Sequence, residues 1–486
     1  MQFSDLLSGI AVRASGGDAC VTGVTHFAGA VQPGFVFVAL VGQRADGHNY
    51  IHEAVNRGAS GIVSTRQIEL PPHIAWAVAE DGRLALAELA AKFFGYPSKR
   101  LRVIGVTGTN GKTTTTYLVK NILRQTGRSV GLIGTVQVEV GDRVLPVKFT
   151  TPEAPQLQEL LRDMADMGAS HAVMEVSSHA LVMQRVARVD YTTAVFTNLT
   201  QDHLDFHCTM ENYFRAKARL FTEPTNTMGK TAVINVDDAY GGRLVPLCSG
   251  QVLTFGLVHK ADIAATAVRQ GAGGSTFILR TPWGEQEVSI VTPGAHSIYN
   301  ALAAAGASLA EGATLGDVAC GLSLPGVPGR MEPISEGQHF TVLVDYAHSP
   351  DGLENVLRAV KGFAERRIIL VFGCGGDRDR GKRPLMGAIA ARFADVVVVT
   401  SDNPRSEDPL QIIADILDGL PRGNEDSLRV EPERGKAIGL AMALAEKGDV
   451  VLIAGKGHET TQVTREGVFH FDDREEARSA LRRRLP

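Results

Sequence analysis

Short apolar runs alternate with longer amphipathic stretches along most of this chain. The runs are Val36–Val41, Gly61–Ser64, Ala172–Val176, Ala194–Thr197, Ala232–Asn235, Thr341–Val344, Ile368–Phe372, Val396–Thr400 and Val450–Ala454. Uninterrupted runs of this length are typical of strands that are buried on both faces of a sheet. Helical stretches between successive strands predict parallel sheets with helices on both faces. We therefore expect an α/β fold.

Two breaks in this pattern predict three domains. The turn at Tyr96–Ser98 is a plausible linker, and Leu324–Gly329 (LPGVPG) carries too much proline and glycine for regular structure. The expected domains are residues 1–98, 99–329 and 330–486. Three domains fit the length of 486 residues, since domains usually run to roughly 100–200 residues.

The segment Val103–Thr115, VIGVTGTNGKTTT, carries the strongest chemical signal. An apolar strand leads into a glycine-rich loop, after which Lys112 opens a helix, and this order is typical of a loop that binds the phosphates of ATP. Backbone N–H groups and the helix end would hold the phosphates, Lys112 would contact the β- and γ-phosphates, and the Thr113 hydroxyl would bind Mg²⁺. The usual pattern has glycine five residues before Gly111, where this chain has Val106 and places Gly108 inside the loop instead.

Polar loops follow other predicted strands in the same way. In the central domain Ser177–His179 and Asn198–His207 come directly after strands, and in the third domain Gly373–Lys382, Asp402–Arg405 and Gly455–Glu459 do so. Ligands of doubly wound sheets bind beyond the carboxyl ends of the strands. The positions of these loops therefore predict one site on each of the two sheets.

Composition and charge exclude several classes of function. The chain is 44% hydrophobic and 21% charged, and its net charge of −4 indicates neither nucleic-acid binding nor an anionic membrane surface. Its five cysteines are scattered without zinc-site spacing, which favours a reducing compartment over a disulfide framework. The N-terminal segment lacks the features of a signal peptide, and no apolar run is long enough to span a membrane. We expect a cytoplasmic protein.

Two further side chains are candidates for metal chemistry, and a lysine lies near them in the sequence. Glu175 ends a predicted strand, and His203 lies in DHLDFH among further acidic and histidine side chains, although a lone loop histidine is more often structural. Lys217 falls on the polar face of the predicted helix YFRAKARLF, where a lysine is solvated by default.

Several motifs together carry a family resemblance. They are TGTNGKT, MEVSSHAL, DHLDFH, YFRAKARLF, GRME, DYAHSPDGL, GCGGDRDRGKRP, DNPRSEDP and AGKGHE. This set resembles the Mur ligases and folylpolyglutamate synthetases, which use ATP and Mg²⁺ to form an amide through an acyl phosphate. It is most similar to the members that add meso-diaminopimelate to UDP-N-acetylmuramoyl-L-alanyl-D-glutamate in peptidoglycan synthesis. The resemblance implies a UDP-substrate domain, a central ATPase-type domain and a Rossmann-like amino-acid domain in a monomer that binds only small molecules.

The resemblance also implies roles for individual residues. The ATP set is Gly108, Thr109, Asn110, Gly111, Lys112, Thr113, Thr114, Asn300, Arg330, Asp345 and His348. The UDP-substrate set is Gln43, Arg44, Ala45, Thr150, Thr151, Ser177 and Arg185, and the amino-acid set is Arg378, Asp402, Asn403, Pro404, Arg405, Gly455 and Glu459. Lys112, Glu175, His203 and Lys217 would be catalytic, with Lys217 carbamylated (N6-carboxylysine) and Mg²⁺ held by Thr113, Glu175, His203 and that carbamate.

The chain departs from the family pattern at two places. Phe27-Ala28-Gly29 replaces an Asp-Ser-Arg segment that contacts uridine, and GAHSIYN keeps only Asn300 of an adenine-contacting motif. Four alternatives stay open. These are a lysine-adding ligase, a folylpolyglutamate-type ligase, a non-catalytic nucleotide-binding regulator, and, for Arg405, a surface turn in which it only pairs with Glu407 or Asp408.

Overall fold

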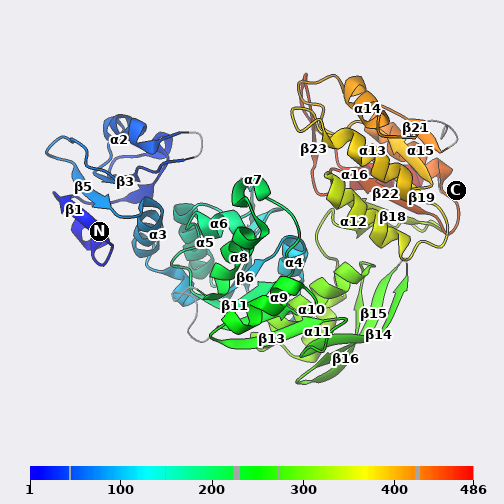
Figure 1. Cartoon of the computed structure of the whole chain (residues 1–486), viewed down its shortest axis with the longest axis horizontal. Coiled ribbons are helices and arrows are strands. Elements are labelled where there is room, and N and C mark those ends of the chain that lie inside the picture. The colour runs from blue at the N-terminus through cyan, green and yellow to red at the C-terminus, as the bar shows by residue number, and fades with distance from the viewer. Residues whose placement is uncertain (43–44, 148, 223–229, 272, 422–426, 485–486) are drawn as a thin grey trace. The chain divides into compact units, whose positions relative to one another are not determined.

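The computed structural model describes residues 1–42, 45–147, 149–222, 230–271, 273–421 and 427–484. Its contacts divide the chain into two compact units, each built of helices and strands (Figure 1). The first unit comprises Met1–Ile263 with Ala303–Asp317, and the second comprises Ala264–Leu302 with Val318–Pro486. The expected α/β class is confirmed, whereas the three domain boundaries stay predictions. No helix in the described ranges has the length and apolar character needed to cross a bilayer.

The first unit begins with a five-stranded sheet in the order β1-β5-β4-β3-β2. Strands β2 to β5 are parallel and β1 pairs antiparallel with β5. The elements are α1 (Phe3–Leu7), β1 (Val12–Gly16), β2 (Gly23–Thr25), η1 (Ala28–Ala30), β3 (Phe35–Val38), η2 (Gly47–Tyr50), α2 (Ile51–Asn56), β4 (Gly61–Ser64), β5 (Ala75–Ala79), α3 (Gly82–Phe93) and η3 (Pro97–Arg100).

The rest of the first unit is built on six parallel strands in the order β13-β12-β11-β6-β10-β7, to which β8 and β9 add antiparallel. The strands are β6 (Arg102–Thr107), β7 (Val130–Ile133), β8 (Val138–Val140), β9 (Arg143–Leu145), β10 (His171–Glu175), β11 (Tyr191–Phe196), β12 (Thr231–Asn235) and β13 (Gln251–Gly256). The helices are α4 (Lys112–Gln125), α5 (Ala154–Asp166), α6 (Ser178–Val182), α7 (Leu204–His207), α8 (Met210–Thr222), α9 (Ala239–Leu244) and η5 (Val245–Leu247). Since β6 lies between β10 and β11, the loops after these three strands meet at one sheet edge.

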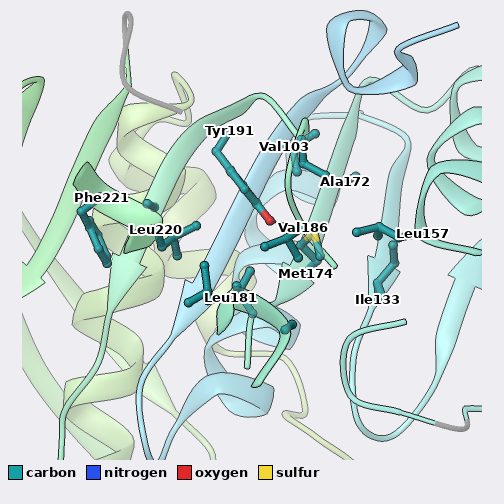
Figure 2. Close-up of a cluster of buried hydrophobic side chains, with 14 of the residues drawn as sticks. Val103, Ile133, Leu157, Ala172, Met174, Leu181, Val186, Tyr191, Leu220 and Phe221 are labelled. Atoms are coloured by element: carbon teal, nitrogen blue, oxygen red, sulfur yellow. Dashed lines mark hydrogen bonds between the residues drawn. The ribbon is translucent and has the colours of Figure 1, made fainter. Parts of the chain in front are cut away.

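A buried apolar cluster fixes these strands against their helices. Figure 2 shows Val103 of β6 and Met174 of β10 in this cluster with Leu157 of α5 and Leu220 of α8. All four side chains are fully buried. The helices are therefore packed closely enough to hold the loops at the carboxyl edge in fixed positions.

A buried carboxylate lies at the opposite, amino edge of this sheet. Glu311 accepts hydrogen bonds from the hydroxyls of Thr192 (2.7 Å) and Thr193 (2.6 Å), and it forms an ion pair with Arg102. His171 Nε2 lies 3.6 Å from its other oxygen. Burial alone would raise the pKa of Glu311, but the contacts with His171, the two threonines and Arg102 lower it to about 2. The charged form therefore stabilises the folded sheet.

We expect Glu311→Gln to lower the free energy of unfolding at pH 7 by about 2–3 kcal/mol, because it leaves buried donors without their anion. The folded-state pKa lies below the ordinary value of 4.5, so the contribution of Glu311 is present above about pH 4.5 and is lost as the pH falls toward 2. Urea unfolding at several pH values should show the free energies of unfolding of the variant and the wild type converging in acid. The exposed Glu69→Gln is the control, and a constant gap at all pH values would contradict the assignment.

The second unit contains a six-stranded sheet in the order β17-β18-β22-β19-β20-β21, parallel except for β17. Its strands are β17 (Glu332–Pro333), β18 (Thr341–Asp345), β19 (Ile368–Phe372), β20 (Val396–Val399), β21 (Leu428–Val430) and β22 (Val450–Ala454), with a β23 (Thr461–Thr464) and β24 (Gly467–His470) hairpin. Its helices are α12 (Pro350–Lys361), α13 (Lys382–Phe393), α14 (Pro409–Leu417), α15 (Arg434–Leu444) and α16 (Asp473–Arg484). Along β19, Leu370 packs on the face of α12 to α14 and Ile369 on the face of α15 and α16, so both faces are buried.

Some elements differ from the sequence expectation. The antiparallel strands β14 (Ile263–Gly271), β15 (Gly274–Thr281) and β16 (Gly284–Ile290) were not expected, since their half-exposed sequences lack long apolar runs. They precede α10 (Ala295–Ala310) and α11 (Leu315–Leu322). The predicted strand Val36–Val41 ends earlier than expected, because β3 ends at Val38 and Val41 is exposed. The predicted linker turn at Tyr96 leads into η3, whose Pro97 and Ser98 are buried.

Candidate active site

The loop Gly108–Gly111 joins β6 to α4, as predicted. Gly111 precedes the helix with a φ of +84°, and Gly108 has a φ of +153°. A Cβ atom on Gly108 would lie 1.9 Å from the Thr197 hydroxyl oxygen, so no larger residue fits there. Lys112, Thr113 and Thr114 form the first turn of α4, where the backbone N–H groups of a helix have no helical partners. The loop can therefore hold a polyphosphate.

The loop that follows β11 supports this phosphate loop. Asn198 accepts from the Asn110 backbone N–H at 2.9 Å and donates back to its carbonyl at 3.1 Å. Thr197 donates to the same carbonyl at 2.6 Å, and Thr109 N–H donates to Asn198 O at 2.9 Å. The backbone of Thr109 and Asn110 is thereby fixed from a neighbouring strand.

Two lysine side chains converge on one carbonyl oxygen of the loop. Lys112 Nζ donates to Gly108 O at 2.9 Å and to Thr109 O at 2.7 Å. Lys217 Nζ, from α8, donates to the same Gly108 O at 2.7 Å. Residues more than a hundred positions apart in the sequence thus meet at the phosphate loop.

Lys217 is buried, and the expectation of a solvated lysine is wrong. Its side chain is 1% exposed, with Nζ 4.7 Å from the centre of the Tyr213 ring. Burial, and next the charge of Lys112, lower its pKa well below the ordinary value. The helix places Lys217 on the side that packs beneath the phosphate loop, whereas Asn212 and Arg215 lie on its exposed side. A lysine with a lowered pKa is available as a neutral amine.

Glu175 lies at the end of β10 with a fully buried side chain. Its Oε1 accepts from the Thr113 hydroxyl at 2.9 Å and from the Thr135 N–H at 2.7 Å, and its Oε2 accepts from the Thr135 hydroxyl at 3.1 Å. These donors are neutral, and the carboxylate is next to the first turn of α4. An oxygen-rich site beside a phosphate loop is suited to a hard cation.

His203 lies at the start of α7 with its side chain about half exposed, 3.3 Å from Asp202. Its ring centre is 6.2 Å from that of Tyr213, the ring that Lys217 also contacts. The neighbouring His207 is buried, lies 2.9 Å from the Ser178 hydroxyl and stacks on Tyr213. Burial lowers the pKa of His207 to about 4, so this ring is a neutral structural element. His203 is therefore the histidine of DHLDFH that is accessible to a ligand.

Four of the residues predicted to hold the UDP substrate, Thr150, Thr151, Ser177 and Arg185, lie around the carboxyl end of β10. Thr151 donates to Glu175 O at 2.9 Å and accepts from the Ser177 N–H at 3.1 Å, while Arg185 donates to Thr151 O at 3.2 Å and pairs with Glu153 at 2.7 Å. The Thr150 hydroxyl accepts from Thr135 at 3.0 Å. Ala45 is described, whereas Gln43 and Arg44 lie outside the described residues.

In the second unit, Asp345 ends β18 with its carboxylate buried. It accepts from the N–H groups of Met331 (2.7 Å) and Ala347 (2.8 Å), and burial raises its pKa although Arg330 opposes this. The Arg330 guanidinium lies 4.7 Å from the centre of the Tyr346 ring. Asn300 is buried in α10 and His348 is exposed after β18.

The amino-acid set of the second unit also forms one cluster. Arg405 Nη1 donates to Gly376 O at 2.7 Å, and its backbone has a φ of +53°. Asn403 donates to Glu459 at 2.8 Å, and a Cβ on Gly455 would lie 2.6 Å from Asp402 Oδ2. Pro404 lies between Asn403 and Arg405 in the chain, and Arg378 is exposed on the loop after β19.

In the described part of the chain Arg405 bonds to Gly376 O, and no ion pair joins it to Glu407 or Asp408, the acids of the alternative interpretation. The Glu407 carboxylate pairs with Arg383 at 2.9 Å and Arg380 at 3.0 Å, and Asp408 accepts from the Leu410 N–H as the cap of α14. Glu407 is thus paired with other arginines, and Asp408 serves as a helix cap.

Comparison with known proteins identifies the family. Residues 106–308 match the Mur ligase middle domain, and residues 329–457 match the Mur ligase, glutamate ligase domain. The chain belongs to the Mur ligase family. It is 47% identical over 459 residues to the UDP-N-acetylmuramoyl-L-alanyl-D-glutamate–2,6-diaminopimelate ligase of Geobacillus thermodenitrificans, with 93% of each chain covered.

Two solved structures extend this comparison. A structure of a UDP-N-acetylmuramoyl-L-alanyl-D-glutamate–2,6-diaminopimelate ligase is 33% identical and has a TM-score of 0.74, covering 100% of this Mur ligase and 99% of that chain. The crystal structure of MurF ligase from Thermotoga maritima in complex with ADP is 21% identical, with a TM-score of 0.62 and coverage of 96% and 99%. The second likeness shows a shared fold.

The first unit of this Mur ligase offers donors that suit Mg²⁺. Within the described residues, no three His, Cys, Asp or Glu side chains gather as a metal cage. Mg²⁺, however, is usually held by one or two protein oxygens together with substrate phosphates and water. The Thr113 hydroxyl and the buried Glu175 carboxylate provide such oxygens beside the phosphate loop.

Three residues of this Mur ligase were missed in the sequence. Thr135 and Asn198 support Glu175 and the phosphate loop, and Lys456 is fully buried, with Nζ 3.0 Å from Asn403 Oδ1 and 3.3 Å from Glu459. Asn198 follows β11, a neighbour of β6, Thr135 follows β7, a neighbour of β10, and Lys456 lies in AGKGHE, so their positions after strands were a possible signal. Their supporting contacts depend on sheet order, which the sequence alone did not provide.

Proposed function

We propose that this Mur ligase joins meso-diaminopimelate to UDP-N-acetylmuramoyl-L-alanyl-D-glutamate, with cleavage of ATP to ADP and phosphate. The observation that carries this proposal is its 47% identity, over 93% of both chains, to a ligase named for that reaction. The reaction would supply a peptidoglycan precursor. Its five free cysteines support a reducing cytoplasm.

In the first half of the reaction, the substrate carboxylate attacks the γ-phosphorus of ATP, and the bond to ADP breaks. The loop N–H groups and Lys112 would hold the transferring phosphoryl group and neutralise its charge. Mg²⁺, when bound by Thr113, Glu175, His203 and a carbamate on Lys217, would stabilise the charge on the phosphate oxygens. Thr150, Thr151, Ser177 and Arg185 would orient the UDP substrate beside it.

In the second half, the amine attacks the acyl phosphate, and phosphate leaves as the amide forms. An acyl phosphate is readily hydrolysed, so the site must exclude water while it exists. Arg330, Asp345, His348 and Asn300 would contact the nucleotide. Arg405 and Arg378 would bind the distal carboxylate of diaminopimelate, because a guanidinium can hold a carboxylate by two parallel hydrogen bonds. Asn403, Gly455 and Glu459 would bind the remaining polar groups.

An amino-acid panel in a phosphate-release assay tests the proposal. Phosphate release should require ATP, the UDP-dipeptide and meso-diaminopimelate together. Efficient use of lysine would favour the lysine-adding alternative, and use of a folate substrate with glutamate would favour the folylpolyglutamate type. Nucleotide binding without any substrate-dependent phosphate release would favour a regulator.

We expect Lys217→Ala to be nearly inactive and to be partly rescued by acetate, if Lys217 carries a carbamate. A neutral amine can combine with CO₂, and the burial and lowered pKa of Lys217 favour the neutral amine. Acetate would restore an anion where the carbamate is lost. Phosphate release with and without acetate, together with mass measurement of the intact protein, checks the expectation.

Lys230→Ala is the matched control, because Lys230 is also buried and its amine donates to Leu220 O in α8. This variant should lose stability without any response to acetate. A plain amine at Lys217 in fully active enzyme would refute the carbamate and leave the ligase assignment unaffected.

A further inference from the structure

A fully buried arginine lies beneath the amino-acid cluster of the second unit. Arg383, in the first turn of α13, donates to both carboxylate oxygens of Glu407 at 2.9 and 3.0 Å and to Asp415 at 2.8 Å. It also donates to Gly375 O at 3.3 Å. A buried guanidinium is costly to desolvate, so its position must be fixed by partners that compensate its charge.

The partners of Arg383 belong to two loops that carry proposed amino-acid ligands. Glu407 follows Arg405 on the loop after β20, and Gly375 precedes Arg378 on the loop after β19. Glu407 also accepts from the Asp377 N–H at 2.6 Å. The hydrogen bond from Arg383 is the main cause that lowers the pKa of Glu407 to about 2. The pair therefore stays ionised at neutral pH.

Further bonds join the same two loops above Arg383. Gly376 N–H donates to Asn403 O at 2.9 Å, Arg405 Nη1 donates to Gly376 O at 2.7 Å, and the Ser406 hydroxyl donates to Asp377 at 2.6 Å. The Arg405 guanidinium is thus positioned by a backbone whose own location depends on the contact between Glu407 and Arg383.

We propose that Arg383 and Glu407 form a clamp that positions Arg405, and that this clamp sets selectivity for an amino acid with a distal carboxylate. The inference rests on the proposed function. Arg383 and Glu407 are positioning residues here, since they are occupied with each other. Loss of the clamp should allow the Arg405 guanidinium to shift. Such a shift weakens a two-bond contact to the distal carboxylate more than it weakens the binding of ATP or the UDP-dipeptide.

The test uses the full-length enzyme and steady-state phosphate release. Arg383→Met and Glu407→Gln remove the clamp from opposite sides, and Glu407→Gln keeps the shape of the side chain if Arg383→Met does not fold. Each should raise the KM for meso-diaminopimelate on the order of 10- to 100-fold. The KM values for ATP and the UDP-dipeptide should stay within about twofold, and the preference for diaminopimelate over lysine should fall by a similar factor.

Arg367→Met is the matched control. Arg367 pairs with the buried Asp449 at 2.6 Å in the same unit, but at the amino ends of β19 and β22, away from these loops. It should change stability without changing selectivity. Variants that lose stability alone, or that raise all three KM values equally, would overturn the clamp. Failure of the wild type to use diaminopimelate would instead overturn the proposed function, before any variant is compared.

Discussion

Lys112→Ala is expected to lower substrate-dependent phosphate release at least about 100-fold, equivalent to about 3 kcal/mol of barrier. The amine of Lys112 is folded over the phosphate loop, where it contacts Gly108 O and Thr109 O. Charge stabilisation at that point acts on the transferring phosphoryl group, which carries most of the charge in the transition state. Steady-state kinetics with all three substrates measure the effect.

The fold should survive this substitution. Lys112 is half-buried and its amine bonds to two carbonyl oxygens of its own loop, so the free energy of unfolding should change by about 1 kcal/mol or less. Lys92→Ala, which removes an exposed contact to Ser8 O, is the control and should keep full activity. Near-normal turnover by Lys112→Ala would contradict the phosphate-loop assignment.

Arg405→Ala is expected to lower kcat/KM with meso-diaminopimelate on the order of 10²–10³-fold. Diaminopimelate differs from lysine by a carboxylate beside its distal amine, and a guanidinium is the group best suited to bind it. For the same reason the wild type should use lysine at least about 100-fold less well, since lysine would leave Arg405 without its partner. Competing both amino acids in one assay measures this directly.

The control for Arg405→Ala is Arg366→Ala, which removes an exposed ion pair with Glu446 at 3.0 Å in the same unit. This control should leave kcat/KM unchanged, because exposed ion pairs contribute little to stability. Efficient lysine incorporation by the wild type would overturn the specificity while leaving the ligase chemistry in place.

The phosphate loop was predictable because its signal is local. The strand, the glycines and the helix start are all contained in thirteen residues, and the structure places each as expected. The structure also explains why Val106 stands at the usual glycine position and Gly108 lies inside the loop. Val106 is fully buried inside β6 and pairs with Glu175 of β10 and Val195 of β11. The strand therefore continues past the usual glycine position, and the sharp turn begins at Gly108.

The supporting residues were not predictable in the same way. A lysine or arginine in an amphipathic helix is most often solvated, and Lys217 and Arg383 carry no local sign of burial. Their burial follows from the order of strands, which brings α8 under the loop after β6 and α13 under the loops after β19 and β20. Sheet order depends on contacts between distant segments, and the apolar pattern alone does not determine it.

The shared carbonyl at Gly108 has a consequence for how the enzyme starts working. It accepts hydrogen bonds from Lys112 and from the unmodified amine of Lys217. A carbamate on Lys217 would keep one N–H that can still donate to Gly108 O, but it would replace a neutral or cationic amine by an anion near Lys112. The unmodified and the carbamylated forms would therefore differ in the charge that they place beneath the phosphate loop. Protein freed of dissolved CO₂ would then start with little activity, and added bicarbonate would restore it.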